Sequence, residues 1–425
     1  MIGVPTLAVK AFPALLTRFG GFAASLVFST AINLLAIPFV IVTLGKETWG
    51  ELALAQATAA IFGIIVAFGW GTVGAALVAS LTPPERPQMY VDSLVSRIYL
   101  FLMAAPVMYV VMLLITQDSP QVAALASVSY VLPFVGASWF FIGQAKPWKL
   151  FFLDVLPQGL GIISGVLLIQ FVPEPIVFVA CLLFFNLLAV LLGAAGATAR
   201  TGHHVKADFR FTAAMARLKS QKYGVIAAGT GSLNSNLPML AVNQVVTASL
   251  PQYALADKLF RFAVAGFGPV LQVIQGWIPE GGPGQRDHRI RTVARLAPVA
   301  GLVAGVLLAA LTPWASALFS GGEILIGYSL SVPFGLILGG VIVAQVVGLA
   351  CLIPLGKGAA LAKSTAIGAA FNVPLMFALG IVWGAPGVAW AVGVAELIVA
   401  AYQLKVVHDS LRSSAPVTDT ASKAP

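Results

Sequence analysis

The residues best suited to chemistry lie in one apolar stretch, residues 254–279. On a helix with about 100° per residue, one face of this stretch carries, within about 60°, Asp257, Arg261, Gly268, Gln272 and Gln275. An ionisable side chain inside a membrane costs about 2.5 to 3.5 kcal/mol on insertion scales, so it is a functional candidate by default. Asp257 and Arg261 are four residues apart and can pair. Arg261 could instead bind a diphosphate, because its planar guanidinium matches two phosphate oxygens.

Lys258 lies roughly 100° from this polar face and could add a second positive charge. A simpler interpretation is that Asp257, Lys258 and Arg261 only mark the outer lipid interface. We predict the substrate-binding role, because two of these three residues break the loop charge asymmetry described below.

A second set of polar residues carries amides and hydroxyls without acid or metal partners. Asn234 and Asn236 fall in the apolar run 224–249, Asn33 falls in the run 19–43, and Gln56 aligns with Asp257 when the sequence is shifted by 201 residues. Such groups suit hydrogen bonds to sugar hydroxyls, and they suit helix–helix contacts equally well. We predict these four residues as substrate contacts and keep helix packing as the alternative.

Glu396 lies within the last apolar run, 386–407. Apolar surroundings favour the protonated carboxyl, which makes Glu396 a candidate for proton coupling. The alternative is a structural hydrogen bond to another helix.

These polar residues stand out because the chain is apolar. Of its 425 residues, 59% are hydrophobic and only 9% are charged, whereas soluble domains carry about 25% charged residues. The net charge of +9 would suggest nucleic acid in another composition; here we predict membrane topology and no nucleic-acid partner. Cys181 and Cys351 lie in apolar runs and the four histidines show no metal-ligand spacing, so we predict no metal and no cofactor.

Twelve apolar runs are long enough to cross a bilayer, whose hydrocarbon core of about 30 Å needs around 20 helical residues. They lie near residues 19–43, 52–80, 98–116, 121–143, 150–172, 176–199, 224–249, 254–279, 296–319, 324–353, 364–383 and 386–407. The sequence therefore predicts an all-α, multi-pass membrane protein with about 12 transmembrane helices. Prolines inside these runs, such as Pro133 and Pro374, predict kinks.

The loops differ sharply in charge. Of the 24 Lys and Arg residues, all but Lys46, Lys258 and Arg261 fall on the side shared with both termini. Because basic loops stay in the cytoplasm, both termini are predicted to be cytoplasmic. Arg97, just ahead of the third run, counts among these loop residues, and Asp154 is predicted to lie at the lipid interface.

The polar stretch 200–222 divides the chain nearly evenly and predicts a linker. We expect an N-terminal six-helix lobe over 1–210, a C-terminal six-helix lobe over 211–412 and a disordered cytoplasmic tail over 413–425. For residues 1–18 the sequence predicts either a short interfacial helix or an unstructured tail. Four G-x-x-x-G motifs permit close helix approach, at Gly161/Gly165, Gly301/Gly305, Gly335/Gly339 and Gly380/Gly384. A chain with 42 glycines also contains several such motifs by chance.

Four stretches of the chain carry a resemblance to a known group of proteins. They are LGKETWGELALAQA with FGWGTVG (44–74), QYALADKLFRF through QGWIPE (252–280), CLIPLGKGAALAKS (351–364) and GAPGVAWAVGVAE (384–396). With these stretches the chain resembles Wzx-type flippases of the multidrug/oligosaccharidyl-lipid/polysaccharide (MOP) exporter superfamily. Lipid II flippases of that superfamily usually have fourteen spans, and drug exporters often carry an acid in the first span, where this chain has Ser25, Ser29, Thr30 and Asn33. Both departures favour the Wzx branch.

The resemblance implies an alternating-access transporter of the bacterial plasma membrane that flips an undecaprenyl-diphosphate-linked oligosaccharide for surface polysaccharide biosynthesis. It also implies membrane lipids, a polysaccharide polymerase and glycosyltransferases as partners. We expect no enzymatic activity, because the short outer connections hold no paired carboxylates. The main alternative is a drug or metabolite:cation antiporter of the same superfamily, and a multispan glycosyltransferase or polymerase is a weaker one.

Overall fold

Helices make up all regular structure in the part of the chain that the structure describes. The structure is a computed structural model, and it describes residues 6–116, 119–199, 205–220, 222–280 and 282–413. Ten segments of these residues are long and apolar enough to cross a membrane. The longest, Gly358–Arg412, contains two of the predicted runs, separated at Gly384, where the backbone leaves the helical conformation. The all-α, multi-pass prediction is therefore confirmed.

The chain forms two compact units. Unit 1 contains residues 1–244 and 317–324, and unit 2 contains residues 245–316 and 325–425. The division into two six-helix lobes, residues 1–210 and 211–412, stays a prediction. The predicted tail lies outside the described residues except for Ser413, at which the last helix ends.

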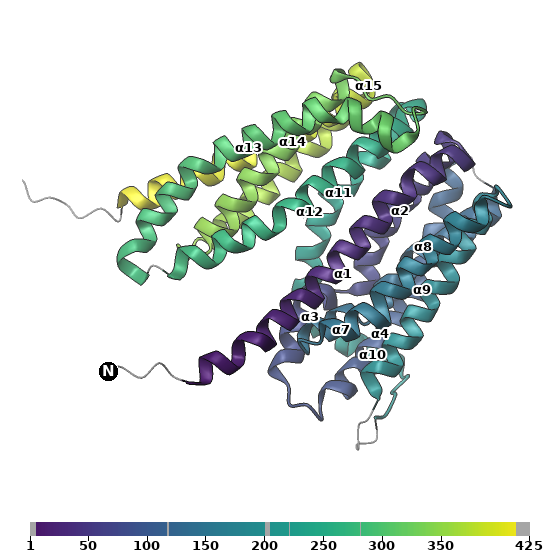
Figure 1. Ribbon diagram of the computed structural model, residues 1–425, viewed down its shortest axis with the longest axis horizontal. Coiled ribbons are helices and arrows are strands. Elements are labelled where there is room, and N and C mark those ends of the chain that lie inside the picture. Colours follow the sequence, from purple (N-terminus) through teal and green to yellow (C-terminus); the bar gives the residue numbers. More distant parts are fainter. Residues whose placement is uncertain (1–5, 117–118, 200–204, 221, 281, 414–425) are drawn as a thin grey trace, which may run out of the picture. The chain divides into compact units, whose positions relative to one another are not determined.

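Unit 1 is built from eleven helices in the described residues (Figure 1). They are α1 (Thr6–Leu44), α2 (Lys46–Ala67), α3 (Trp70–Ser80), α4 (Arg86–Ile115), α5 (Pro120–Val131), α6 (Ser138–Gly143), α7 (Pro147–Leu150), α8 (Leu156–Ile169), α9 (Pro175–Thr198), α10 (Phe211–Ser220) and α11 (Lys222–Val245). Helix α1 is continuous from Thr6, so the helical alternative for the N-terminal region holds from that residue onward.

Three predicted spans of unit 1 are interrupted. The run 52–80 divides into α2 and α3 at Phe68 and Gly69, whose φ angles of 40° and 81° are left-handed. The run 121–143 divides into α5, a 3₁₀ segment (Leu132–Val135) and α6. A π-helical segment (Phe151–Val155) precedes α8. Broken helices in membranes are tolerated only where other protein groups satisfy the freed backbone. We therefore expect side chains of unit 1 to bind the backbone groups at these breaks.

The predicted linker is attached to α4. The side-chain amide of Gln88 donates to the carbonyl of Lys206 (2.8 Å) and accepts from its N–H (3.0 Å). The hydroxyl of Tyr99 donates to the carbonyl of Phe209 (2.5 Å), and Arg217 of α10 pairs with Asp92 (2.8 Å). The described part of the linker, residues 205–220, therefore belongs structurally to unit 1.

Unit 2 contains the remaining long helices. They are α12 (Leu250–Glu280), most of α13 (Gly282–Ser320), α14 (Tyr328–Gln345) with a π-helical extension (Val346–Leu352), and α15 (Gly358–Ser413). Helices α12, α14 and α15 pack around apolar residues such as Leu271, Leu338 and Val407.

Two of the predicted G-x-x-x-G motifs form one contact, between α13 and α14. A Cβ atom added at Gly301 would lie 2.6 Å from the carbonyl oxygen of Gly339, and one added at Gly305 would lie 2.5 Å from that of Gly335. Real Cβ atoms do not approach a carbonyl oxygen this closely, so only glycine fits. The prediction of close approach is confirmed for this pair of motifs.

We expect Gly305→Ala to lower the melting temperature of the purified protein, because the methyl group must push two backbones apart at a cost of about 1 to 3 kcal/mol. The matched control is Gly276→Ala in α12, where an added Cβ meets nothing within 4 Å. That control should leave stability unchanged or raise it by up to about 1 kcal/mol through helix propensity. Equal melting temperatures of Gly305→Ala and the wild type would contradict the close-contact assignment.

Candidate functional site

The predicted ion pair on α12 is present. Arg261 Nε lies 2.6 Å from Asp257 Oδ2, with the Asp257 side chain 14% exposed and that of Arg261 40% exposed. On the opposite side of α12, Leu255 and Leu259 are buried. The ring of Tyr253, one turn before Asp257, contacts Phe334 of α14 at 5.1 Å between centroids. Asp257 and Arg261 therefore lie on the side of α12 away from Leu255 and Leu259, and Asp257 borders the contact of Tyr253 with α14.

The other residues of the predicted polar face are also at least partly exposed. Gln272 is exposed, Gln275 is half-buried, and a Cβ added at Gly268 would meet nothing within 4 Å. Lys258, predicted to lie beside this face, is half-buried. The structure thus confirms the pairing of Asp257 with Arg261, and the predicted polar face is at least partly exposed at Gln272 and Gln275. Its role in substrate binding stays a prediction.

Glu396 lies where α15 contacts α14. A Cβ added at Gly340 of α14 would lie 2.7 Å from the Cβ of Glu396, so the helices approach closely at this level. A hydrogen bond to another helix, the structural alternative for Glu396, stays a prediction. Its role in proton coupling stays a prediction.

The predicted amide contacts belong to unit 1. Asn33 donates from Nδ2 to the carbonyl of Ser29 (2.9 Å), and Asn236 donates to the carbonyl of Ser232 (2.9 Å), each one turn earlier in its own helix. Asn234 and Gln56 are half-buried. Within α11, Ser232 also donates to the carbonyl of Ala60 in α2 (3.3 Å). The amides of Asn33 and Asn236 thus donate within their own helices, and the roles in substrate contact and in helix–helix contact both stay predictions.

A buried charged cluster in unit 1 was missed by the sequence reasoning. Arg97 is 1% exposed and Asp154 is 5% exposed. The prediction that Arg97 belongs to a cytoplasmic loop is wrong, because α4 begins at Arg86 and carries Arg97 into a membrane-spanning segment. The prediction of an interfacial Asp154 is wrong as well, since the π-helical segment turns this side chain inward.

Arg97 satisfies the backbone at the break of the fourth span. Its Nη1 donates to the carbonyls of Gly136 (2.7 Å) and Phe134 (3.3 Å), which the break frees from helical bonding. Its Nε and Nη2 donate to the backbone and hydroxyl oxygens of Ser93 (3.4 and 3.2 Å). The guanidinium also lies 5.4 Å from the centroid of the Trp139 ring, so a cation–π interaction with this ring stabilises its charge.

Asp154 reaches the same break from the other side. A Cβ added at Gly136 would lie 3.1 Å from Asp154 Oδ1. Gly136 is therefore the point at which α4, the broken span and the π-helical segment converge. The one signal in the sequence was Ser93, one helical turn before Arg97 and able to bind its guanidinium.

Comparison with known proteins identifies the architecture. No family model matches the sequence, and no curated protein matches it either. Among solved structures, the chain is similar to the lipid II flippase MurJ in an inward closed conformation (TM-score 0.68, 14% identity, 92% of this chain and 89% of that chain). It is also similar to a multidrug resistance MATE family transporter of the MOP superfamily in an inward-facing conformation (TM-score 0.66, 13% identity, 91% and 95%) and to a eukaryotic MATE transporter (TM-score 0.61, 13% identity, 95% and 98%). The chain thus has the fold of these MOP-superfamily transporters.

Proposed function

We propose that this protein is a Wzx-type flippase. It moves a polyprenyl-diphosphate-linked oligosaccharide from the cytoplasmic to the outer face of the bacterial plasma membrane by alternating access, with both termini in the cytoplasm and the lipid tail in the bilayer. The protein binds and moves the lipid-linked glycan without enzymatic chemistry. A polysaccharide polymerase and glycosyltransferases are the partners that this role implies.

The observation that carries the proposal is the partly exposed Asp257–Arg261 ion pair on α12, a helix within a candidate membrane span. Arg261 is held in one orientation by Asp257 yet keeps 40% of its side chain accessible, and its fork suits a diphosphate. Lys258, in the neighbouring position, adds positive charge. The fold of a known flippase for a lipid-linked precursor supports the same reading.

The second candidate is a drug or metabolite:cation antiporter, because MATE transporters share the fold almost equally well. The first span argues against it, since residues 19–43 contain no acidic side chain that could bind a cation or proton. The glycosyltransferase alternative gains no support from the fold.

The test is transport by the purified protein in liposomes. We expect a fluorescent polyprenyl-diphosphate-linked oligosaccharide to become accessible on the opposite leaflet several-fold faster than in protein-free liposomes. Ethidium, a small organic cation, should cross at the protein-free rate. Transport of ethidium without transport of the glycan would instead establish the antiporter. Repeating the assay with and without a pH gradient measures how far protons drive the reaction.

A further inference from the structure

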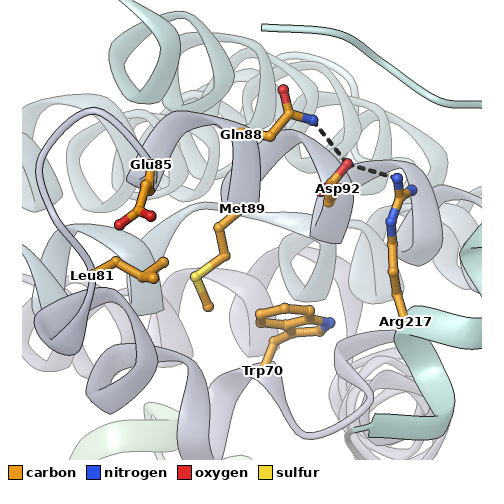
Figure 2. Close-up of a pocket in the computed structure, with 7 residues that line it drawn as sticks. All are labelled: Trp70, Leu81, Glu85, Gln88, Met89, Asp92 and Arg217. Carbon is orange, nitrogen blue, oxygen red and sulfur yellow. Dashed lines mark hydrogen bonds and ion pairs between the residues drawn. The ribbon is translucent and has the colours of Figure 1, made fainter.

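Unit 1 contains a pocket whose lining includes none of the predicted substrate contacts. It has a volume of about 350 Å³ and lies between the end of α3, the start of α4 and the linker helix α10. Its lining consists of Trp70, Leu81, Glu85, Gln88, Met89, Asp92 and Arg217 (Figure 2). All seven belong to unit 1, and the loop and linker beside them carry the charge pattern predicted for the cytoplasmic side.

Trp70 contributes a hydrogen-bond donor that has no acceptor. The residue is 6% exposed, and its Nε1 is buried without a hydrogen-bond partner. Figure 2 shows the indole beside Met89, with Nε1 on the edge that faces the Arg217 side of the pocket. A buried unpaired donor costs about 1 to 3 kcal/mol, so an acceptor atom from an occupant would be favourable here.

Glu85 contributes an acceptor at the opposite side of the pocket. Its Oε2 accepts from the hydroxyl (2.6 Å) and the backbone N–H (3.0 Å) of Thr82. These bonds, the hydroxyl first, lower the pKa of Glu85, so the group is a carboxylate at neutral pH. Since both bonds go to one oxygen, Oε1 can accept further bonds.

Asp92 and Arg217 compensate each other. Asp92 Oδ1 accepts from Arg217 (2.8 Å) and from the amide of Gln88 (3.0 Å), as drawn in Figure 2. Because the charges of Asp92 and Arg217 cancel, Glu85 gives the lining of the pocket one net negative charge. A phosphate or an anionic sugar is therefore disfavoured, and a bare cation has no acceptor to offer the indole N–H.

Neutral sugar rings meet these requirements together. A pyranose hydroxyl both donates and accepts, so one ring can accept from Trp70 Nε1 and donate to Glu85 and Asp92. Its C–H surface can lie against Trp70, Leu81 and Met89. The volume is at the lower end of the range of about 300 to 1,000 Å³ for small-molecule sites, which fits one sugar ring better than a whole lipid-linked oligosaccharide.

We propose that this pocket binds a neutral pyranose ring of the glycan on the predicted cytoplasmic side, next to the linker that runs along α4. The inference rests on the proposed flippase function and adds to it a second site, specific for sugar, in addition to the charged face of α12.

The experiment uses the full-length protein in lipid nanodiscs and saturation-transfer NMR. The probes are glucose, galactose, N-acetylglucosamine, glucuronate and tetraphenylphosphonium. We expect saturation transfer to at least one neutral sugar and a weaker signal from glucuronate. Trp70→Phe keeps the aromatic ring but removes the N–H donor, and it should weaken sugar binding about tenfold. The matched control, Trp314→Phe, alters a tryptophan that is 65% exposed and should bind sugar like the wild type.

Glu85→Gln provides a second variant that leaves the core intact, because Glu85 is exposed; the matched control is Glu323→Gln, also at an exposed position. We expect weaker sugar binding by Glu85→Gln only. The proposal is overturned if no neutral sugar binds the wild type, if only the cation binds, or if both pocket variants bind sugar normally. Glycan transport in liposomes that survives such a result would leave the flippase function standing. Sugar binding without glycan transport would instead reject the flippase.

Discussion

Arg97→Ala should destabilise the protein by about 3 to 5 kcal/mol, because it removes the buried guanidinium that donates to two carbonyls at the break in the fourth span. The carbonyls of Phe134 and Gly136 would lose their partner in a buried setting, and the volume of the guanidinium would become a cavity. The measurement is the melting temperature of the purified protein, followed by size-exclusion chromatography after heating.

Two variants separate this explanation from a general effect of losing an arginine. Arg286→Ala removes a 41% exposed arginine that pairs with Asp287, and such surface pairs contribute at most about 1 kcal/mol. Ser93→Ala removes one of the acceptors of Arg97 and should have an intermediate effect. A melting temperature of Arg97→Ala equal to that of Arg286→Ala would show that the break does not depend on Arg97.

Arg261→Ala should reduce glycan export at least about tenfold, since charge-assisted bonds to phosphate contribute about 1.5 to 3 kcal/mol. The variant would also leave Asp257, which is 14% exposed, without its partner. Arg261→Lys keeps the charge but loses the planar fork, so we expect export between that of Arg261→Ala and the wild type. The measurement is a glycan-export complementation assay with the protein level checked.

Asp257→Asn serves as the companion variant, because it breaks the same ion pair while keeping Arg261. If the pair only supports the fold, Asp257→Asn and Arg261→Ala should lower the protein level alike. If Arg261 binds the diphosphate, Asp257→Asn should retain most of the export. Full export by both Arg261 variants at normal protein levels would remove Arg261 from the mechanism.

What the sequence predicted well depends on local spacing. The pairing of Asp257 with Arg261 follows from a separation of four residues on one helix, and the close approach at Gly301, Gly305, Gly335 and Gly339 follows from spacing and side-chain size. Both features need only the periodicity of a helix. The all-α architecture follows from hydropathy in the same way.

What the sequence did not predict depends on contacts between distant segments. Hydropathy places the third span after Arg97, but the helix continues twelve residues further back, because partners from the broken fourth span make a buried arginine tolerable. The break at Phe68 and Gly69 requires two successive left-handed residues, one of which is not glycine. Nothing in the local pattern distinguishes such a position from the middle of a continuous span.

The polar amides illustrate the same limit at the level of single side chains. Asn33 and Asn236 have the spacing expected of a polar face, yet their amides donate to carbonyls in their own helices. A short side chain has this choice in any helix. Spacing alone therefore predicts where an amide lies and leaves its bonding partner open.

The glycine contact between α13 and α14 limits how these two helices can move. Helices separated by side chains can slide by small adjustments of rotamers, but here main chain meets main chain at Gly301–Gly339 and Gly305–Gly335. A small sliding motion would drive a larger neighbouring side chain into a backbone. The next matching register is four residues away, a step of about 6 Å. Helices α13 and α14 are therefore expected to move together as one rigid pair, or to shift by four residues at once. Gradual bending of unit 2 would then occur at other positions, such as the non-helical Gly384.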